Sequence, residues 1–125
     1  MNDELRKQMA VEFMRRTADG TLAQAAQRLL APGGIHHDWR FPAGWESFLK
    51  AVEEARRSAP ERRLEIKHVL CDGDFVVGHA HVIQRPGDSG SVVFFLFRFE
   101  GERIVEMWAA GQAVAGDSPN VNGAF

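Results

Sequence analysis

Residues 74–112 read DFVVGHAHVIQRPGDSGSVVFFLFRFEGERIVEMWAAGQ, and this stretch decides the fold. It predicts three consecutive strands, at Asp74–Gln84, Ser91–Glu100 and Arg103–Gln112, because β-branched and aromatic runs are separated by turn-forming residues. The middle strand is apolar on both faces, whereas a sheet with one solvated face would alternate with polar residues. We therefore expect helices to cover one face and a second sheet, for instance from another copy of the chain, to cover the other.

The sequence before this stretch predicts three helices and two strands. Apolar residues recur at helical spacing from Asn2 or Asp3 to about Gly20, over residues 22–30, and over residues 45–58. Residues 35–41 predict a short strand and residues 63–71 a longer one. Helices followed by an antiparallel meander are an α+β pattern. The expected fold is a cone, in which a curved antiparallel or mixed sheet packs on three N-terminal helices.

Composition limits the classes of function. The 125-residue chain suits one domain, 1–125, with residues 113–125 as a C-terminal arm. Its net charge is −2 and its charges are mixed, so no basic stripe indicates a nucleic-acid partner. The single cysteine, Cys71, excludes an intramolecular disulfide and suits a reducing compartment. No transmembrane run or signal-peptide pattern is present, so we expect a cytoplasmic protein without a membrane partner.

Short motifs follow one another in a recognisable order. They are LLAP at 29–32, IHHD at 35–38, GD at 73–74 with HAH at 79–81, FRFE at 97–100, IVEMW at 104–108, and DSPN at 117–120 followed by NGAF at 122–125. Their order and spacing resemble the SnoaL-like (polyketide cyclase-like) branch of the nuclear transport factor 2-like superfamily. The resemblance covers nearly the whole chain. It implies a cone whose helices and curved sheet enclose a pocket for a small apolar molecule.

Three histidines are the candidate catalytic groups. His79 and His81 are two apart on one strand, so their side chains leave the same face, and the bulkier side chains there favour that face as the interior. The resemblance places a histidine at His37, and the adjacent Asp38 could orient an imidazole. Imidazoles titrate near neutrality and suit proton transfer. The alternatives are ordinary buried or edge histidines, or a divalent metal bound by all three; otherwise we expect no cofactor.

The resemblance also implies the walls of the pocket. The implied substrate-binding residues are Trp39, Trp45, Phe95, Phe97, Met107 and Ala109. Ordinary core packing is the alternative for the aromatic ones. Cyclases of this branch usually carry an acidic residue after the tryptophan of the last strand, where this chain has alanine. The usual carboxylate is therefore missing, and the expected pocket is more apolar.

Three functions are compatible with these residues. The first is an enzyme that transfers protons on a carbonyl-bearing, possibly polyketide-like molecule by isomerisation, cyclisation, aldol-type reaction or dehydration. The second is a non-catalytic ligand-binding or dimeric interaction module, and the third is a tri-histidine metal-dependent enzyme. The histidines favour the first or third, and the missing carboxylate favours the second; we adopt the first.

A homodimer is also expected from the sequence. The small residues Val76, Gly78, Ala80 and Val82 would form a flat outer face of the sheet. An apolar patch of that extent is unfavourable in a monomer, which predicts that a second copy covers it.

Overall fold

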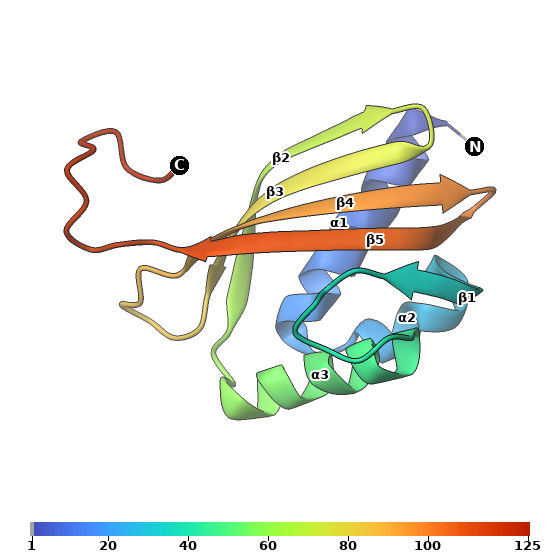
Figure 1. Ribbon diagram of the computed structural model, residues 1–125, viewed down its shortest axis with the longest axis horizontal. Coiled ribbons are helices and arrows are strands. Elements are labelled where there is room, and N and C mark those ends of the chain that lie inside the picture. The colour runs from blue at the N-terminus through green and yellow to red at the C-terminus, as the bar shows by residue number, and fades with distance from the viewer. Residues whose placement is uncertain (1) are drawn as a thin grey trace.

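The computed structural model describes residues 2–125 (Figure 1). Within these residues, three helices lie on one face of a curved five-stranded sheet. The helices are α1 (Asp3–Asp19), α2 (Leu22–Leu29) and α3 (Trp45–Ser58), and the strands are β1 (Leu30–His36), β2 (Arg63–Asp72), β3 (Phe75–Ile83), β4 (Ser91–Glu100) and β5 (Arg103–Ala113). The expected α+β cone is confirmed.

The sheet is mixed, with strand order β1-β5-β4-β3-β2. Strands β2 to β5 form the predicted antiparallel meander, and β1 pairs with β5 in parallel. The expected strand at residues 35–41 is wrong in its bounds, because β1 begins at Leu30, directly after α2, and ends at His36. Between Leu30 and Ile35 its register against β5 shifts. This irregularity accommodates the Pro-Gly-Gly segment, which forms few of the regular hydrogen bonds of a sheet. In the sequence, the same segment is typical of the end of a helix rather than of a strand.

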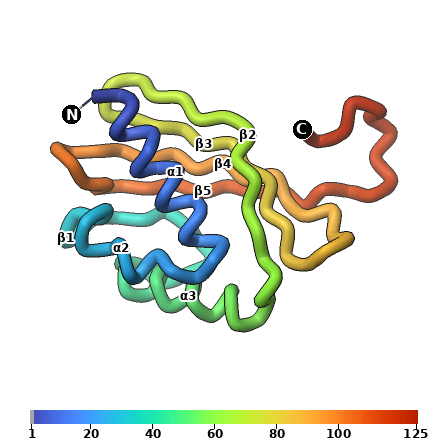
Figure 2. Tube along the Cα trace, turned by 180° about the vertical axis from the view of Figure 1, so that it is seen from behind, coloured from blue at the N-terminus to red at the C-terminus, as the bar shows by residue number. Residues whose placement is uncertain are grey.

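Helix α1 has both predicted ends. The Asn2 side chain accepts a hydrogen bond from the Leu5 N–H at 2.8 Å, which satisfies one of the free donors of the first turn. Gly20 ends the helix with a φ of 79°, a left-handed conformation that glycine adopts without steric cost. Figure 2 shows α1 crossing the back of the sheet, with α2 and α3 near β1.

The inner face of the sheet, which packs against the helices, carries the small residues of β3. Val76 and Ala80 are fully buried, and a β-carbon added at Gly78 would lie 2.6 Å from Cε of Met14 on α1. The prediction that this face is the outer one is wrong, and the bulkier face with His79 points away from the helices. The reason is that the Met14 side chain on α1 fills the space over Gly78. Only small side chains on the inner face of β3 leave room for it.

Aromatic side chains fill the centre of the core. Phe97 on β4 meets Phe13 on α1 edge to face, with ring centroids 5.0 Å apart. Phe13 also stacks on Phe48 of α3 at 5.8 Å. This cluster joins the sheet to two helices. Among residues 2–125, no helix is both long enough and apolar enough to cross a membrane.

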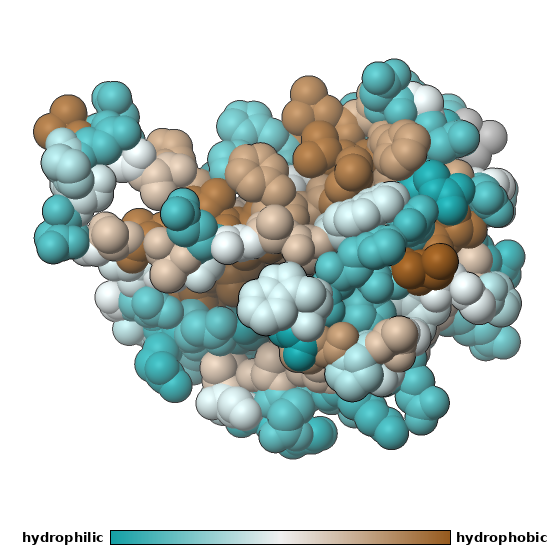
Figure 3. Space-filling model, viewed as in Figure 1, coloured by the Kyte–Doolittle hydropathy of each residue, from teal (hydrophilic) through white to brown (hydrophobic). Residues whose placement is uncertain are grey.

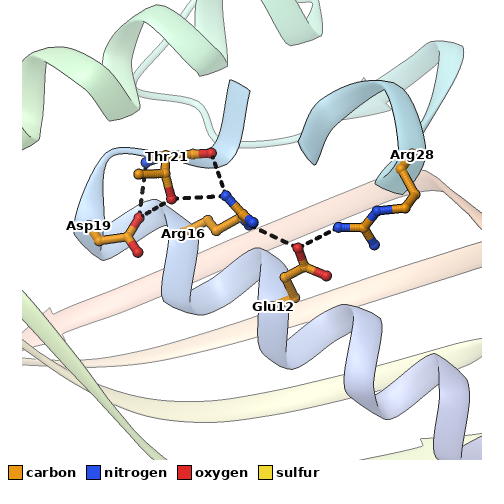
Figure 4. A network of polar contacts seen from close by, with 5 residues as sticks. All are labelled: Glu12, Arg16, Asp19, Thr21 and Arg28. Carbon is orange, nitrogen blue, oxygen red and sulfur yellow. Dashed lines mark hydrogen bonds and ion pairs between the residues drawn. The ribbon is translucent and has the colours of Figure 1, made fainter. Parts of the chain in front are cut away.

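A polar network joins α1 to α2 (Figure 4). The carboxylate of Glu12 accepts hydrogen bonds from Arg28 Nη2 at 2.5 Å and from Arg16 Nε at 2.8 Å. Arg16 also donates to the Thr21 carbonyl at 3.1 Å, and the Thr21 N–H donates to Asp19. The bond from Arg28 lowers the pKa of Glu12, and although burial opposes this, the bond from Arg16 adds to the lowering.

Glu12→Gln should lower the free energy of unfolding at pH 7 by less than about 1 kcal/mol, because the ion pairs are partly exposed. The folded-state pKa of Glu12 lies below its ordinary value, so its contribution is complete above roughly pH 5 and is lost as the pH falls through the folded pKa. Urea unfolding at pH 7 and at pH 3 measures this, with the exposed Glu61→Gln as control. If wild type and Glu12→Gln differ more in their free energy of unfolding at pH 3 than at pH 7, the role assigned to the carboxylate is contradicted.

Candidate functional site

A cavity of about 320 Å³ lies between α3, the loop after β1 and the inner face of the sheet. Its floor is apolar and is formed by Val82, Val93, Phe95 and Ala109 on β3, β4 and β5. Helix α3 supplies the facing wall, and charged or polar side chains stand around these apolar surfaces; they include Asp38, Arg40, Arg62, Gln84, Ser91 and Gln112. Ligand pockets typically combine such apolar walls with a few polar groups that orient the ligand.

A second hollow runs along the exposed side of α1. It is larger, at about 640 Å³, and charged side chains such as Lys7, Glu12 and Arg15 line it. Nearly all of its walls come from one helix and the turn after it, with Val69 of β2 as the contribution from the sheet. It therefore lacks the opposed apolar walls that would enclose a small molecule, and the 320 Å³ cavity is the better site.

Asp38 is the carboxylate of the cavity wall, and its side chain is only 4 % exposed. Arg40 holds it in a bidentate ion pair, in which Nε donates to Oδ1 at 2.9 Å and Nη2 donates to Oδ2 at 2.7 Å. Burial by itself would raise the pKa of Asp38, but the hydrogen bonds and charge of Arg40 outweigh it and leave the pKa below its ordinary value. The group is therefore ionised at neutral pH.

The loop that carries Asp38 and Arg40 is anchored by His36. Its imidazole is buried, with Nε2 2.9 Å from the Pro42 carbonyl oxygen and Nδ1 accepting the Asp38 N–H at 3.2 Å. These partners fit a neutral ring that carries its proton on Nε2. His36 therefore shapes the loop rather than facing the cavity, and packs against Phe48 at a centroid distance of 5.3 Å.

A family model described as a SnoaL-like domain matches residues 10–107, which run from α1 into β5. The chain belongs to the SnoaL-like family. The resemblance drawn from the order of the motifs is thus confirmed, and with it the expected kind of fold. A search of curated proteins finds no match to this chain.

Solved structures of three other proteins share the fold of this one. AclR from Streptomyces galilaeus, a candidate hydroxylase, is 18 % identical with a TM-score of 0.72, over 89 % of this chain and 91 % of that one. A candidate SnoaL-like isomerase from Agrobacterium tumefaciens is 13 % identical with a TM-score of 0.71, over 86 % and 98 %. IdmH from Streptomyces antibioticus, a candidate polyketide cyclase, is 18 % identical with a TM-score of 0.65, over 84 % and 90 %. Such identities establish the fold alone.

The expectation that three imidazoles of this SnoaL-like protein share the cavity is wrong. His37 lies on the outer face, where it stacks on Trp108 and its Nε2 is 2.7 Å from Glu106 Oε2. The hydrogen bond from His37 lowers the pKa of Glu106, and Arg98 contributes to the same shift. The cause of the error at His37 is the turn of the chain at the end of β1, which sends the neighbouring His36 inward instead.

The other two predicted histidines also lie on the outer face. His79 Nδ1 is 3.0 Å from His68 Nδ1, and His81 Nε2 is 2.7 Å from the Ser89 carbonyl oxygen. Their placement follows from the packing of α1 against the small residues of β3, which fixes the faces of that strand. Within residues 2–125, no group of three or more His, Cys, Asp or Glu side chains is arranged to hold a metal ion, so the tri-histidine set is not assembled.

The expected pocket walls divide into two groups. Trp39, Phe95 and Ala109 line the cavity, with Trp39 90 % exposed at its rim. Trp45, Phe97 and Met107 instead pack in the core, where Phe97 and Met107 are fully buried. The register Phe97↔Met107 sets this pair deeper along the sheet than Phe95↔Ala109.

Sequence reasoning missed Arg40 and Arg62 as cavity residues. Arg62 stands beside Arg63 just before β2, and two adjacent basic residues are too common to indicate a binding site by themselves. A signal was available, because Leu64 and Ile66 of β2 alternate toward the inner face and the same period extended backwards places Arg62 there. Arg40 carried no such signal, because it lies in an irregular loop whose path depends on the tertiary contacts of His36.

Proposed function

We propose that this SnoaL-like protein binds a small molecule with an apolar body in the cavity and transfers a proton next to a carbonyl group, with Asp38 as the base. The observation that carries the proposal is a buried, ionised carboxylate beside guanidinium groups on an apolar floor. A base and a cation at one wall are the two groups that enolisation needs. The expected chemistry is retained from the sequence, whereas the base changes from an imidazole to Asp38.

The hydrogen bonds of Asp38 leave room for this role. Oδ1 accepts from the N–H and Nε of Arg40, whereas Oδ2 accepts one bond, from Nη2. A carboxylate oxygen has two lone-pair directions, so Oδ2 can take a proton. In the proposed step the C–H bond α to the carbonyl breaks, an O–H bond forms at Asp38, and the electron pair moves onto the carbonyl oxygen. A guanidinium stabilises the resulting enolate.

The test is deuterium exchange at the α carbon of a small aryl ketone such as 2-tetralone, followed by NMR in D₂O. We expect the folded protein to accelerate exchange over buffer, because abstraction and return of the proton need no further reactant. Urea-unfolded protein at the same concentration is the control for the effect of free carboxylates. Equal rates with folded and unfolded protein would refute a proton-transfer function.

Ligand binding without catalysis is the second candidate. It is favoured by the ion pair with Arg40, which lowers the pKa of Asp38 and so weakens it as a base. Ala109 also stands where cyclases of this branch usually carry an acid. Binding of the ketone without accelerated exchange would select this function.

A second copy of the chain is the proposed partner of the outer face of the sheet. Leu70 and Phe94 are 61 % and 49 % exposed there, and Figure 3 shows apolar side chains gathered over this face. The adjoining ionic group, formed by His37, Arg98 and Glu106, carries both signs of charge. A surface with both signs and an apolar centre can pair with itself across a twofold axis. These features support the homodimer expected from the sequence, now through the bulky face of β3.

Leu70→Arg combined with Phe94→Arg should convert a micromolar dimer into a monomer. Two buried charges at the centre of an interface weaken association by about 100-fold or more. Sedimentation velocity measures the state, and circular dichroism checks that the fold is kept. The control is Leu5→Arg, an exposed leucine on α1 away from this face. A dimer with a Kd of about 1 micromolar would be almost fully formed at roughly 50 micromolar protein. A wild-type protein that is monomeric at that concentration would therefore contradict the proposal.

A further inference from the structure

Arg62 is a cation of the cavity wall that has no carboxylate partner among residues 2–125. Its Nη1 donates to Gln84 Oε1 at 2.9 Å, a neutral acceptor, and its Nε is enclosed without a hydrogen-bond partner among the described residues. Arg6 provides a comparison, because its Nε is also enclosed but its Nη2 forms an ion pair with Asp74 at 3.2 Å. Charged groups removed from water are normally paired, so the unpaired Arg62 indicates a missing anion.

The charges of the whole cavity lead to the same conclusion. Among the lining residues that the structure describes, two guanidiniums, of Arg40 and Arg62, stand against one carboxylate, of Asp38. Asp38 is bound through both oxygens by Arg40, which leaves Arg62 uncompensated. Burial lowers the pKa of Arg62, and the nearby charge of Arg40 lowers it further. The side chain nevertheless stays protonated at neutral pH, since an arginine cannot be deprotonated in a protein under such conditions.

We propose that Arg62 is the anion-binding residue of this cavity and that the natural ligand is a small carboxylate with an apolar body. The inference rests on the proposed function only through the use of the same cavity, and binding of the carboxylate requires no proton transfer. It replaces the expectation of a purely apolar ligand by a more specific class of molecule.

The surroundings of Arg62 favour a carboxylate over a larger anion. Gln84 occupies one edge of the guanidinium through Nη1, and its own backbone N–H donates to Asp88 Oδ2 at 3.3 Å, which ties it to the turn after β3. A guanidinium offers parallel N–H pairs that match the two oxygens of a carboxylate. One arginine satisfies a single negative charge, whereas a phosphate dianion needs further cations. The apolar body would then lie over Val93 and Phe95 of the floor.

The test compares two probes of the same shape, 2-naphthoate and 2-naphthamide, by NMR titration of the wild-type protein. We expect the carboxylate to bind about 10- to 100-fold more tightly, as for a charge-assisted bond in a partly enclosed site. Arg62→Gln should abolish this preference and Arg62→Lys should keep part of it. Arg63→Gln, the same change at the exposed neighbour, should leave it intact. The preference should be constant from pH 6 to 9, because neither the guanidinium nor the carboxylate titrates there.

Two results would overturn the proposal: no preference for the carboxylate in the wild type, which includes failure of both probes to bind, or a preference that survives in Arg62→Gln. A structural role is tested separately with Arg62→Met, which keeps the aliphatic stem. Its midpoint of thermal unfolding should fall by no more than about 5 °C, since one hydrogen bond to Gln84 and no ion pair is lost; a larger fall would assign Arg62 to stability. If the protein prefers the carboxylate but does not accelerate α-exchange, proton transfer is refuted and the anion site at Arg62 is retained. If it accelerates α-exchange but shows no preference for the carboxylate, the anion site is refuted and proton transfer is retained.

Discussion

Asp38→Asn lowers the rate of α-deuterium exchange by about 100- to 10,000-fold if Asp38 is the base, which is the usual effect of removing a positioned proton-transfer group. The amide keeps the shape of the carboxylate but cannot accept the proton. Because the change also removes the ion pair with Arg40, circular dichroism and urea unfolding must show that the variant is folded at the assay temperature. Asp117→Asn, in the exposed C-terminal segment, is the control for the charge change. A folded Asp38→Asn protein with the wild-type rate would exclude this residue as the base.

The pH dependence of exchange distinguishes Asp38 from an imidazole. The base acts in its deprotonated form, and Arg40 holds the pKa of Asp38 below its ordinary value, which is about 3.9. The rate of exchange catalysed by the protein should therefore stay constant between pH 8 and pH 5. An imidazole base would lose activity as the pH falls through about 6.5.

Arg40→Gln provides a sharper version of the same measurement. Without the guanidinium, the burial that raises the pKa of Asp38 is no longer outweighed, so the acid limb of the pH–rate profile should move to higher pH. A limb that stays in place would show that another group is titrating.

Phe97→Ala should lower the free energy of unfolding by about 3–5 kcal/mol, the range for removing a large buried aromatic side chain. Phe97 is fully buried, stands edge to face with Phe13 at 5.0 Å and stacks beside Phe95 at 6.0 Å. The truncation leaves a cavity beneath α1 that the rigid sheet cannot close. The loss is large because the variant no longer gains the transfer free energy of burying the ring, and because the remaining cavity adds a further cost.

Phe94→Ala is the matched control, three positions earlier on β4 and facing the opposite way. Its ring is half exposed and stacks on His79 at 4.5 Å, so we expect a loss of less than about 1 kcal/mol when unfolding is measured on monomeric protein. Urea denaturation of the two variants on the Leu70→Arg background, at a concentration at which sedimentation velocity shows a monomer, gives the comparison without a contribution from dimerisation. Similar losses at both positions would contradict the assignment of faces along β4.

Local sequence determined most of the elements of this protein. Asn2 and Gly20 bound the first helix because capping is a property of a few adjacent residues. The run from Ser91 to Glu100 is a strand with the bounds predicted, because its β-branched and aromatic side chains favour that conformation. The order of the motifs likewise identified the family. These are short-range signals, and each can be recognised without knowing what packs against it.

Tertiary structure alone decided which face of each element the site uses. Period two in β3 separates Val76, Gly78 and Ala80 from His79 and His81, but it does not say which set is interior. Met14 decided it, because a methionine on α1 fills the space over Gly78, so the small residues face the helices and the imidazoles face outward. Contacts of the same kind brought the distant Asp38 and Arg62 to one cavity. Packing depends on volumes contributed by segments far apart in the chain, and such complementarity is absent from any local pattern.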